Sequence, residues 1–298
     1  MTHWYGSGFR RMHKNTLLDV PFVAMDTQPV DGIVLNPTVD SGYHTYEPIT
    51  LRMDTLNDPI QTIDEAYFKL QLLSRRLIKP NTLNLDGLFS VLPVIAWTSL
   101  GPMLPEHVSQ QRQLAWANGR ELTVTHNDKF PYMLNYYTPS GVRIASGSQV
   151  RLGAYLAEGT TVMPAGFVNF NAGSLGPCMI EGRVSAGVTL GSNTDIGGGA
   201  SIMGTLSGGN SHVIRIGSGC LLGANSGIGI SLGDYCTVEA GTYITAGKKV
   251  LFNGKVIKAR QLSGQDNLLF LHNSETGQLI CQTKKNTVAL NDALHHND

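Results

Sequence analysis

The stretch Ile216–Val250 reads "IGSGCLLGANSGIGISLGDYCTVEAGTYITAGKKV", and its aliphatic residues return at a spacing of six. A helix repeats every 3.6 residues and a strand every two, so neither period explains the pattern. A six-residue period is typical of a β-helix, in which each unit forms a short strand and a corner and three units close one triangular coil. The stretch therefore predicts a prism built from three parallel sheets.

The same spacing begins well before this stretch. The expected inward positions are Ile144, Val150, Leu156, Val162, Val168, Ser174, Ile180, Val184, Leu190, Ile196, Ile202, Ile216, Leu222, Ile228, Leu232, Val238, Ile244 and Val250. The spacing is four instead of six at two places, from Ile180 to Val184 and from Ile228 to Leu232. The residue four places after an aliphatic is usually small, which suits a tight corner, and Gly often follows the aliphatic itself. At about 4.8 Å per coil, the run predicts about six stacked coils.

The repeat divides the chain into three predicted parts. Residues 1–142 are an N-terminal α/β domain, residues 143–251 the β-helix, and residues 252–298 a small β extension that caps the open end of the coil. In the extension, residues 267–284 predict two strands around an "SETG" turn. The segment 203–215 breaks the rhythm and predicts an external loop, which is either functional or a tolerated insertion.

Inside the N-terminal part, two helices and two strands are expected. A helix is predicted within 57–80, capped by Asn57 or Asp58 with Pro59 in its first turn and stopped by Pro80. A second helix is predicted over 104–119. The segments 87–99 and 121–128 have the composition of strands.

Composition excludes several classes of protein. The 298 residues carry 22 basic and 22 acidic side chains, so nucleic acid and anionic membranes are not expected partners. The longest apolar runs are too short to span a bilayer, and the N-terminus lacks the apolar core of a signal peptide. Four widely spaced cysteines predict reduced thiols, and together these features predict a cytoplasmic protein.

Two enzyme classes commonly use such prisms and pair them three-fold, with sites between neighbours. A zinc carbonic anhydrase needs three histidine ligands, and of nine histidines only His212 lies in the coil region, so zinc chemistry is not expected. A CoA-dependent acyltransferase needs cations for phosphates, a channel for the pantetheine arm and a group that handles the proton of the amine. A basic cluster near the end of the coil could meet the first need, or could be a solvated coil end: Lys248, Lys249, Lys255, Lys258 and Arg260.

Glu181 and Arg183 stand out because charged residues are sparse in the middle coils. Two apart on one strand, they project from the same face. Glu181 is the candidate for proton handling, and Arg183 could hold a substrate carboxylate with paired hydrogen bonds. An ordinary surface ion pair is the alternative.

Five blocks in order closely resemble the tetrahydrodipicolinate N-succinyltransferases, in their longer, actinobacterial-like branch. The blocks are "FVNFNAG" (167–173), "EGRVSAGV" (181–188), "GGGASIMGTLSGG" (197–209), "CLLGANSGIGISLGD" (220–234) and "ARQLSG" (259–264). The likeness runs from about Lys129 to Asn286, with "AWTSLGPMLPE" before it, and is less distinct over the first hundred residues.

The resemblance implies a left-handed coil, an exception to the usual right-handed crossover. It also implies a homotrimer with active sites between subunits, succinyl-CoA as donor and a dicarboxylate acceptor, tetrahydrodipicolinate. The product would be N-succinyl-2-amino-6-oxopimelate, in lysine and diaminopimelate biosynthesis.

The resemblance also assigns roles to residues. Glu181 would be catalytic, either as a base or as a covalent acyl carrier, and the Gly204 N–H would stabilise the oxyanion. The expected contacts to succinyl-CoA are Arg183, Gly198, Ser201, Ala224, Glu239, Ala240, Gly247 and Lys258. Some relatives hold a cation on the three-fold axis, but the corresponding residues here are Ser148 and Ala165, so no metal is expected.

Two other functions remain open on these grounds. The chain could be a CoA-dependent acyltransferase with another acyl group or amine, or a scaffold that kept the coil without the chemistry.

Overall fold

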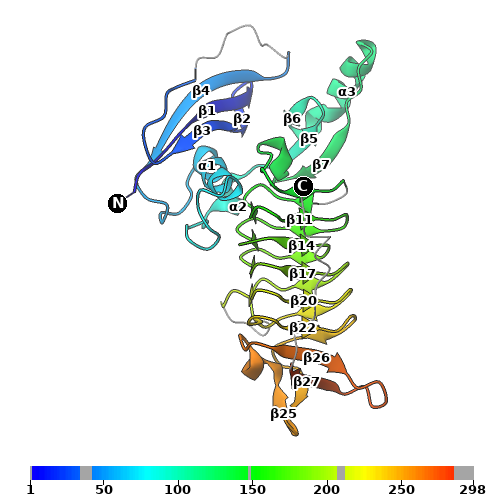
Figure 1. Ribbon diagram of the computed structural model, residues 1–298. Helices are drawn as coiled ribbons and strands as arrows, with labels where there is room; N and C mark the ends of the chain where they lie inside the picture. Colours follow the sequence, from blue (N-terminus) through cyan, green and yellow to red (C-terminus); the bar gives the residue numbers. More distant parts are fainter. Residues whose placement is uncertain (1, 34–41, 147–148, 207–211, 285–298) are drawn as a thin grey trace. The chain divides into compact units, whose positions relative to one another are not determined.

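The computed structural model describes residues 2–33, 42–146, 149–206 and 212–284 (Figure 1). Close contacts divide the chain into two compact units: residues 1–72 with 82–136, and residues 73–81 with 137–298. The three-part division at 142 and 251 is finer than this and stays a prediction.

The second unit is a three-sided parallel β-helix. Within the described residues its strands form a ten-stranded, a six-stranded and a four-stranded face, and pairing within the coil is parallel throughout. The six-stranded face holds β9 (Gln149–Val150), β12 (Phe167–Val168), β15 (Arg183–Val184), β18 (Ser201–Ile202), β21 (Gly227–Ile228) and β23 (Tyr243–Ile244). The four-stranded face holds β10 (Tyr155–Leu156), β13 (Gly173–Ser174), β16 (Thr189–Leu190) and β19 (Arg215–Ile216).

The ten-stranded face adds the C-terminal strands to those of the coil. Its coil strands are β8 (Arg143–Ile144), β11 (Thr161–Val162), β14 (Cys178–Ile180), β17 (Thr194–Ile196), β20 (Leu221–Leu222) and β22 (Thr237–Val238). β26 (Leu268–His272) continues the stack on β22, pairs antiparallel with β27 (Leu279–Thr283), and β24 (Lys249–Phe252) pairs with β25 (Lys255–Lys258). The predicted pair of strands around "SETG" is confirmed.

The predicted inward positions are confirmed as the core of the prism except Ile144, which lies in the first coil strand and is only partly buried. From Val150 to Val250 each is at most 3 % exposed, and Ser174 fills its slot with its hydroxyl 2.6 Å from that of Thr160. The small corner residues are buried as well, Cys220 and Cys236 among them. The six-residue period therefore identifies the side chains that point into the interior of the prism.

The slip in the period corresponds to a shortened corner. β14 ends at Ile180 and β15 begins at Arg183, so only Glu181 and Gly182 join the two faces, whereas the corner one coil on holds residues 197–200. A Cβ at Gly182 would lie 2.4 Å from the carbonyl oxygen of Ala200. Only glycine lets the shortened corner stack on the next coil.

The first unit is a separate α+β structure. β1 (Trp4–His13) pairs antiparallel with β2 (Thr16–Asp19), β3 (Phe22–Asp26) and β4 (Thr45–Met53). A second small sheet joins β5 (Ile95–Thr98) to β6 (Gly101–Met103) and β7 (Val124–Asp128). The helices are α1 (Ile63–Ser74), α2 (Leu88–Val91) and α3 (Val108–Ala117), with short 3₁₀ turns at Pro105–His107 and Met133–Asn135.

Two local expectations for this unit are wrong. The helix in 57–80 begins at Ile63 rather than near Pro59, because Thr62 and Glu65 exchange hydrogen bonds between side chain and backbone N–H at 3.2 and 3.1 Å. It ends at Ser74 rather than at Pro80, since Arg76 already has a left-handed φ of 62°. The segment 87–99 is a strand only from Ile95, since residues 88–91 form α2. The helix ending near Gly119 and the strand in 121–128 are confirmed.

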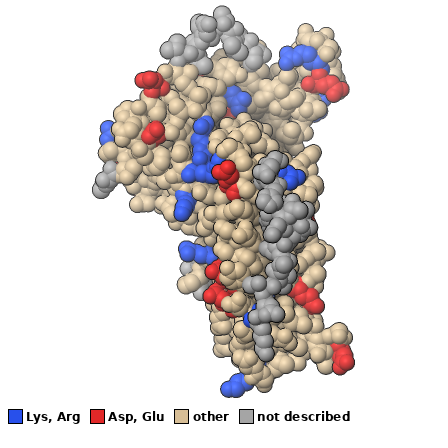
Figure 2. Space-filling model, in the orientation of Figure 1, with Lys and Arg blue, Asp and Glu red and all other residues tan. Residues whose placement is uncertain are grey.

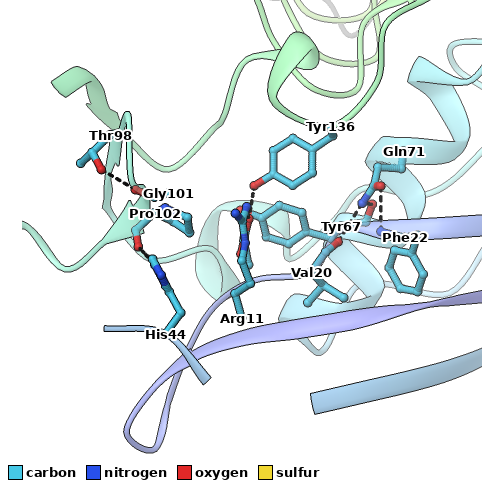
Figure 3. Close-up of polar contacts among 11 residues, drawn as sticks. Arg11, Val20, Phe22, His44, Tyr67, Gln71, Thr98, Gly101, Pro102 and Tyr136 are labelled. Carbon is cyan, nitrogen blue, oxygen red and sulfur yellow. Dashed lines mark hydrogen bonds and ion pairs between the residues drawn. The ribbon is translucent and has the colours of Figure 1, made fainter. Parts of the chain in front are cut away.

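Buried polar side chains hold the first unit together (Figure 3). Gln71 donates to the carbonyl of Val20 at 2.8 Å and accepts from the N–H of Phe22 at 3.0 Å. Arg11 and the hydroxyl of Tyr136 both bind the carboxylate of Asp19, which is fully buried. Each group is paired, as burial requires.

We predict that Gly182→Ala destabilises the coil. The added Cβ meets a backbone oxygen that cannot move without shifting a whole coil, so the free energy of unfolding should fall by about 1–3 kcal/mol. Gly247→Ala is the control, because a Cβ there meets no atom within 4 Å. Thermal unfolding followed by circular dichroism measures both, and equal melting temperatures would contradict the prediction.

We also predict an acid-sensitive first unit. Nε2 of His44 lies 2.7 Å from the carbonyl oxygen of Pro102, and burial lowers the pKa of His44. The folded chain therefore resists a proton that the unfolded chain accepts, so stability should fall as the pH drops below about 6.5. All three tryptophans lie in this unit, so their fluorescence during urea unfolding at pH 7.5 and 5.5 reports on it. His44→Gln should lose less stability on acidification than the parent chain, and an unchanged pH dependence would refute the assignment.

Candidate active site

Four of the expected site residues stack along one edge of the prism. This first edge consists of the corners that lead from the ten-stranded to the six-stranded face. Glu181, Gly198, Ala224 and Ala240 occupy it on successive coils. The carbonyl oxygens of Glu181, Gly198 and Ala224 accept hydrogen bonds from the next coil at 3.4, 2.9 and 2.9 Å. Residues up to 59 positions apart in the chain (181 to 240) are thus stacked in one column of corner residues, which we call the ladder.

Arg183 and Ser201 are neighbours on the adjoining six-stranded face. They are register partners on β15 and β18, and the guanidinium Nε and Nη2 of Arg183 donate to the hydroxyl of Ser201 at 3.0 and 2.6 Å. Arg183 is exposed, and no ion pair joins it to Glu181 within the described residues. The alternative of an ordinary surface ion pair is therefore not what the structure shows.

The carboxylate of Glu181 lies beside the glycines of the next coil. Its Oε2 is 3.5 Å from where a Cβ of Gly198 would be, and the side chain is half-buried. Its backbone is fastened to the next coil at two points, because its N–H donates to the carbonyl of Ile196 at 2.8 Å and its carbonyl accepts from the N–H of Gly199. Figure 2 draws the coil in the orientation of Figure 1, with the strands β11 to β22 of the ten-stranded face in view and blue and red atoms scattered among uncharged ones. On the six-stranded face the outward strand residues other than Arg183 are uncharged: Gln149, Phe167, Ser201, Gly227 and Tyr243. Arg183 and the neighbouring corner residue Glu181 therefore present opposite charges beside an otherwise neutral wall.

Gly204 and Gly247 lie on the opposite edge of the same face. This second edge consists of the corners that follow β18 and β23. A Cβ on Gly204 would lie 3.0 Å from the carbonyl oxygen of Ala186, so the backbone here is closely packed. Its carbonyl accepts from Ile214, while its own N–H donates to no described residue. That N–H is available to an oxyanion.

Glu239 has a structural contact of its own. Its carboxylate accepts from the N–H of His272 at 2.8 Å and from the hydroxyl of Thr242 at 3.3 Å, so it fastens β26 to the last coil. The carboxylate of Glu239 is therefore already hydrogen-bonded within the protein, and a ligand could contact only the exposed part of this residue.

The basic cluster is brought together by the β24–β25 hairpin. Lys249 and Lys258 are direct register partners, and the N–H of Ala259 donates to the carbonyl of Lys248 at 2.8 Å. No carboxylate pairs with Lys248, Lys249, Lys255, Lys258 or Arg260 among the described residues. The cluster lies next to Gly247, where the second edge ends.

The possible metal ligands and two of the thiols can be assessed from the described residues. Among described residues, no three His, Cys, Asp or Glu side chains gather closely enough to hold an ion. Ala165 is a corner residue and Ser148 lies outside the described residues, so the expectation of no axial metal stays a prediction. Burial raises the pKa of the Cys178 and Cys281 thiols to about 12, so neither is a nucleophile at neutral pH. No helix in the described chain is both long and apolar enough to cross a membrane.

Comparison with known proteins agrees with this geometry. Residues 213–246 match the hexapeptide repeat of succinyl-transferase, and residues 92–132 match the middle region of tetrahydrodipicolinate N-succinyltransferase. The second match falls in the first unit and includes the "AWTSLGPMLPE" block on which part of the sequence resemblance rests.

Two relatives and one solved structure are similar over most of their length. The 2,3,4,5-tetrahydropyridine-2,6-dicarboxylate N-succinyltransferase of Vibrio cholerae is 52% identical over 266 residues, covering 87% of this chain and 77% of the relative. Its counterpart from Pseudomonas aeruginosa is 56% identical over 240 residues, covering 78% and 70%. A Campylobacter jejuni crystal structure, provisionally described as a 2,3,4,5-tetrahydropyridine-2-carboxylate N-succinyltransferase, superposes with a TM-score of 0.79 at 27% identity, covering 93% and 91%.

The expected fold, a left-handed parallel β-helix with an α/β part before it and a β extension after it, is confirmed by the repeat match and this superposition. Because more than half of the aligned residues are identical in relatives that the alignments cover over more than two thirds of their length, the chain belongs to the tetrahydrodipicolinate N-succinyltransferase family of enzymes.

Proposed function

We propose that this chain transfers the succinyl group of succinyl-CoA to the amine of ring-opened tetrahydrodipicolinate, in lysine and diaminopimelate biosynthesis. The reaction yields N-succinyl-2-amino-6-oxopimelate and free CoA. The observation that carries the proposal is the arrangement along the six-stranded face and its first edge, where a carboxylate, a guanidinium and a hydroxyl lie on neighbouring coils in a member of this family.

In the proposed step the amine nitrogen attacks the thioester carbonyl, and its proton passes to the carboxylate of Glu181. The tetrahedral intermediate then expels CoA as the C–S bond breaks. An amine is a better nucleophile than a carboxylate, so Glu181 acts as the base rather than as an acyl carrier. The N–H of Gly204, which donates to none of the described residues, stabilises the oxyanion that forms on the carbonyl oxygen.

Arg183 binds the distal carboxylate of the succinyl group. Both of its hydrogen bonds to Ser201 end on one oxygen, so the guanidinium is oriented while its other N–H groups remain for a ligand. A carboxylate at the end of the acyl chain distinguishes succinyl from acetyl donors.

The rest of the site is assigned by position. The ladder of Gly198, Ala224 and Ala240, with Glu239 and Gly247, offers exposed corners along which the donor lies, and Lys258 with its basic neighbours meets the phosphates. Because a prism has flat faces, a second copy must supply the other wall, so the enzyme works as a homotrimer with shared sites. Because its relatives are biosynthetic enzymes, we place the enzyme in the cytoplasm, without a metal cofactor.

Glu181→Gln should abolish most turnover while leaving the coil intact. The amide keeps the size of the side chain but cannot accept the proton, so kcat should fall by about 10²–10⁴-fold with little change in KM for succinyl-CoA. Thiol release, followed with a chromogenic reagent, measures both constants. A folded variant with full activity would remove the proposed mechanism.

A pre-steady-state experiment separates the two roles of Glu181. As a base it gives no release of CoA before the acceptor is added. A stoichiometric burst of thiol without acceptor, trapped by hydroxylamine as a hydroxamate, would show an acyl carrier instead.

Arg183→Met should weaken selection of the succinyl group. Loss of a charge-assisted contact costs about 1.5–3 kcal/mol, so kcat/KM for succinyl-CoA should fall by about 10- to 100-fold. With acetyl-CoA, which lacks the distal carboxylate, the same variant should change little. If the parent enzyme uses acetyl-CoA as well as succinyl-CoA, this role is wrong and a different acyl donor is the better assignment.

A further inference from the structure

Tyr243 lies against the outer surface of the six-stranded face, where a glycine makes room for its ring. It is the register partner of Gly227 on the preceding coil. A Cβ at Gly227 would fall 2.0, 2.2 and 2.4 Å from three atoms of the tyrosine ring. No other residue type at 227 leaves the ring in this place, and 39 % of Tyr243 remains exposed. The pair therefore presents an aromatic surface on this wall of the prism.

The ring lies between the two charged regions of the face. Arg183, Ser201, Gly227 and Tyr243 are successive register partners, so three coil steps of about 4.8 Å place the strand of Tyr243 about 14 Å from Arg183. On its other side Tyr243 adjoins the basic cluster, because Nζ of Lys248 donates to its carbonyl oxygen at 2.9 Å. Along the face, the region of Arg183 is therefore followed by the ring of Tyr243 and then by the basic cluster.

A CoA thioester has the same order of chemical groups. Its acyl carbon must reach Glu181 and Arg183, and its phosphates need cations. The pantetheine arm between them is a chain of methylenes and two amides, which spans roughly 15 Å when extended, as four to five residues of a peptide do. An apolar ring with an exposed edge is the surface on which such a chain packs.

We propose that Tyr243, seated over Gly227, is the platform on which the pantetheine arm of the donor lies. Tyr243 thereby sets the enzyme's preference for a full-length CoA thioester. This inference rests on the proposed function, because it needs an acyl-CoA donor on this face. It adds a binding residue beyond those that the resemblance assigns.

The chain contains a matched control for this assignment. Tyr235 packs over Gly219 in the same manner, with ring atoms 2.6 and 2.8 Å from a Cβ placed there. It is 46 % exposed, and its carbonyl oxygen accepts from Nζ of Lys284 at 2.9 Å, as that of Tyr243 does from Lys248. Tyr235 stands in the corner before β22, away from the six-stranded face. Tyr235→Ala thus removes an equivalent ring without touching the proposed donor path.

The experiment compares Tyr243→Ala, Tyr243→Phe and Tyr235→Ala with two donors, succinyl-CoA and the short thioester of N-acetylcysteamine. Tyr243→Ala should lower kcat/KM for succinyl-CoA by about 3- to 10-fold through KM, and should lose clearly less with the short donor, which lacks most of the arm. Tyr243→Phe should retain the parent KM, because the ring and not the hydroxyl is the platform. Tyr235→Ala should leave both donors unaffected.

Calorimetric binding of free CoA to Tyr243→Ala gives a second readout, in which the dissociation constant should rise by the same factor. Sedimentation and thermal unfolding check that each variant keeps the parent's assembly and stability. Equal losses with both donors, or an equal loss in Tyr235→Ala, would overturn the platform. Failure of the parent enzyme to release CoA from succinyl-CoA would instead refute the proposed function, so the two failures are distinguishable.

Discussion

The hydrogen bonds that stack one coil on the next are the constraint on which the rest of the second unit depends. Amides such as that of Gly223 donate to the coil below, here to the carbonyl of Val238 at 2.8 Å. Positions far apart in the chain thereby become neighbours at one strand spacing. Inward positions must be aliphatic or small, because the inward side chains of all three faces share one narrow interior. Chemistry is left with outward strand positions and corners, which is where Glu181, Arg183 and Ser201 lie.

This constraint explains why the coil was readable from sequence. Each inward residue is a fixed count from the last, so Val150 or Leu222 is identified by spacing alone, and its burial follows. The same counting places Arg183 next to Ser201, eighteen positions on. The count of eighteen residues per coil fails across the segment 203–215, because Ser201 pairs with Gly227, which lies twenty-six positions later in the chain. The pairing of Gly227 with Tyr243 lies beyond that interruption, so the aromatic surface emerges only from the structure.

The first unit offered no such period, and prediction there was correspondingly weaker. The four-stranded sheet of β1–β4 was not anticipated, since its antiparallel register depends on contacts between distant segments. α2 was mistaken for strand because a short apolar run has no period to distinguish the two. Lys69 shows the same limit. It is wholly buried on an apolar helix, where its ammonium donates to the carbonyls of Leu56, Asp58 and Asn84. Nothing local predicts these three acceptors.

The shortened corner at Glu181 shows how a rigid prism can place a reactive group without a loop. A corner of two residues has few backbone conformations, and Gly182 is pressed against the carbonyl of Ala200. The N–H and carbonyl of Glu181 are both tied to the following coil, so little conformational entropy remains to be lost when a substrate binds. The shortened spacing after Ile180 therefore places the candidate catalytic carboxylate in a tightly held corner. A regular corner would carry the same carboxylate on a longer segment with more freedom, and the geometry of proton transfer would be held less well.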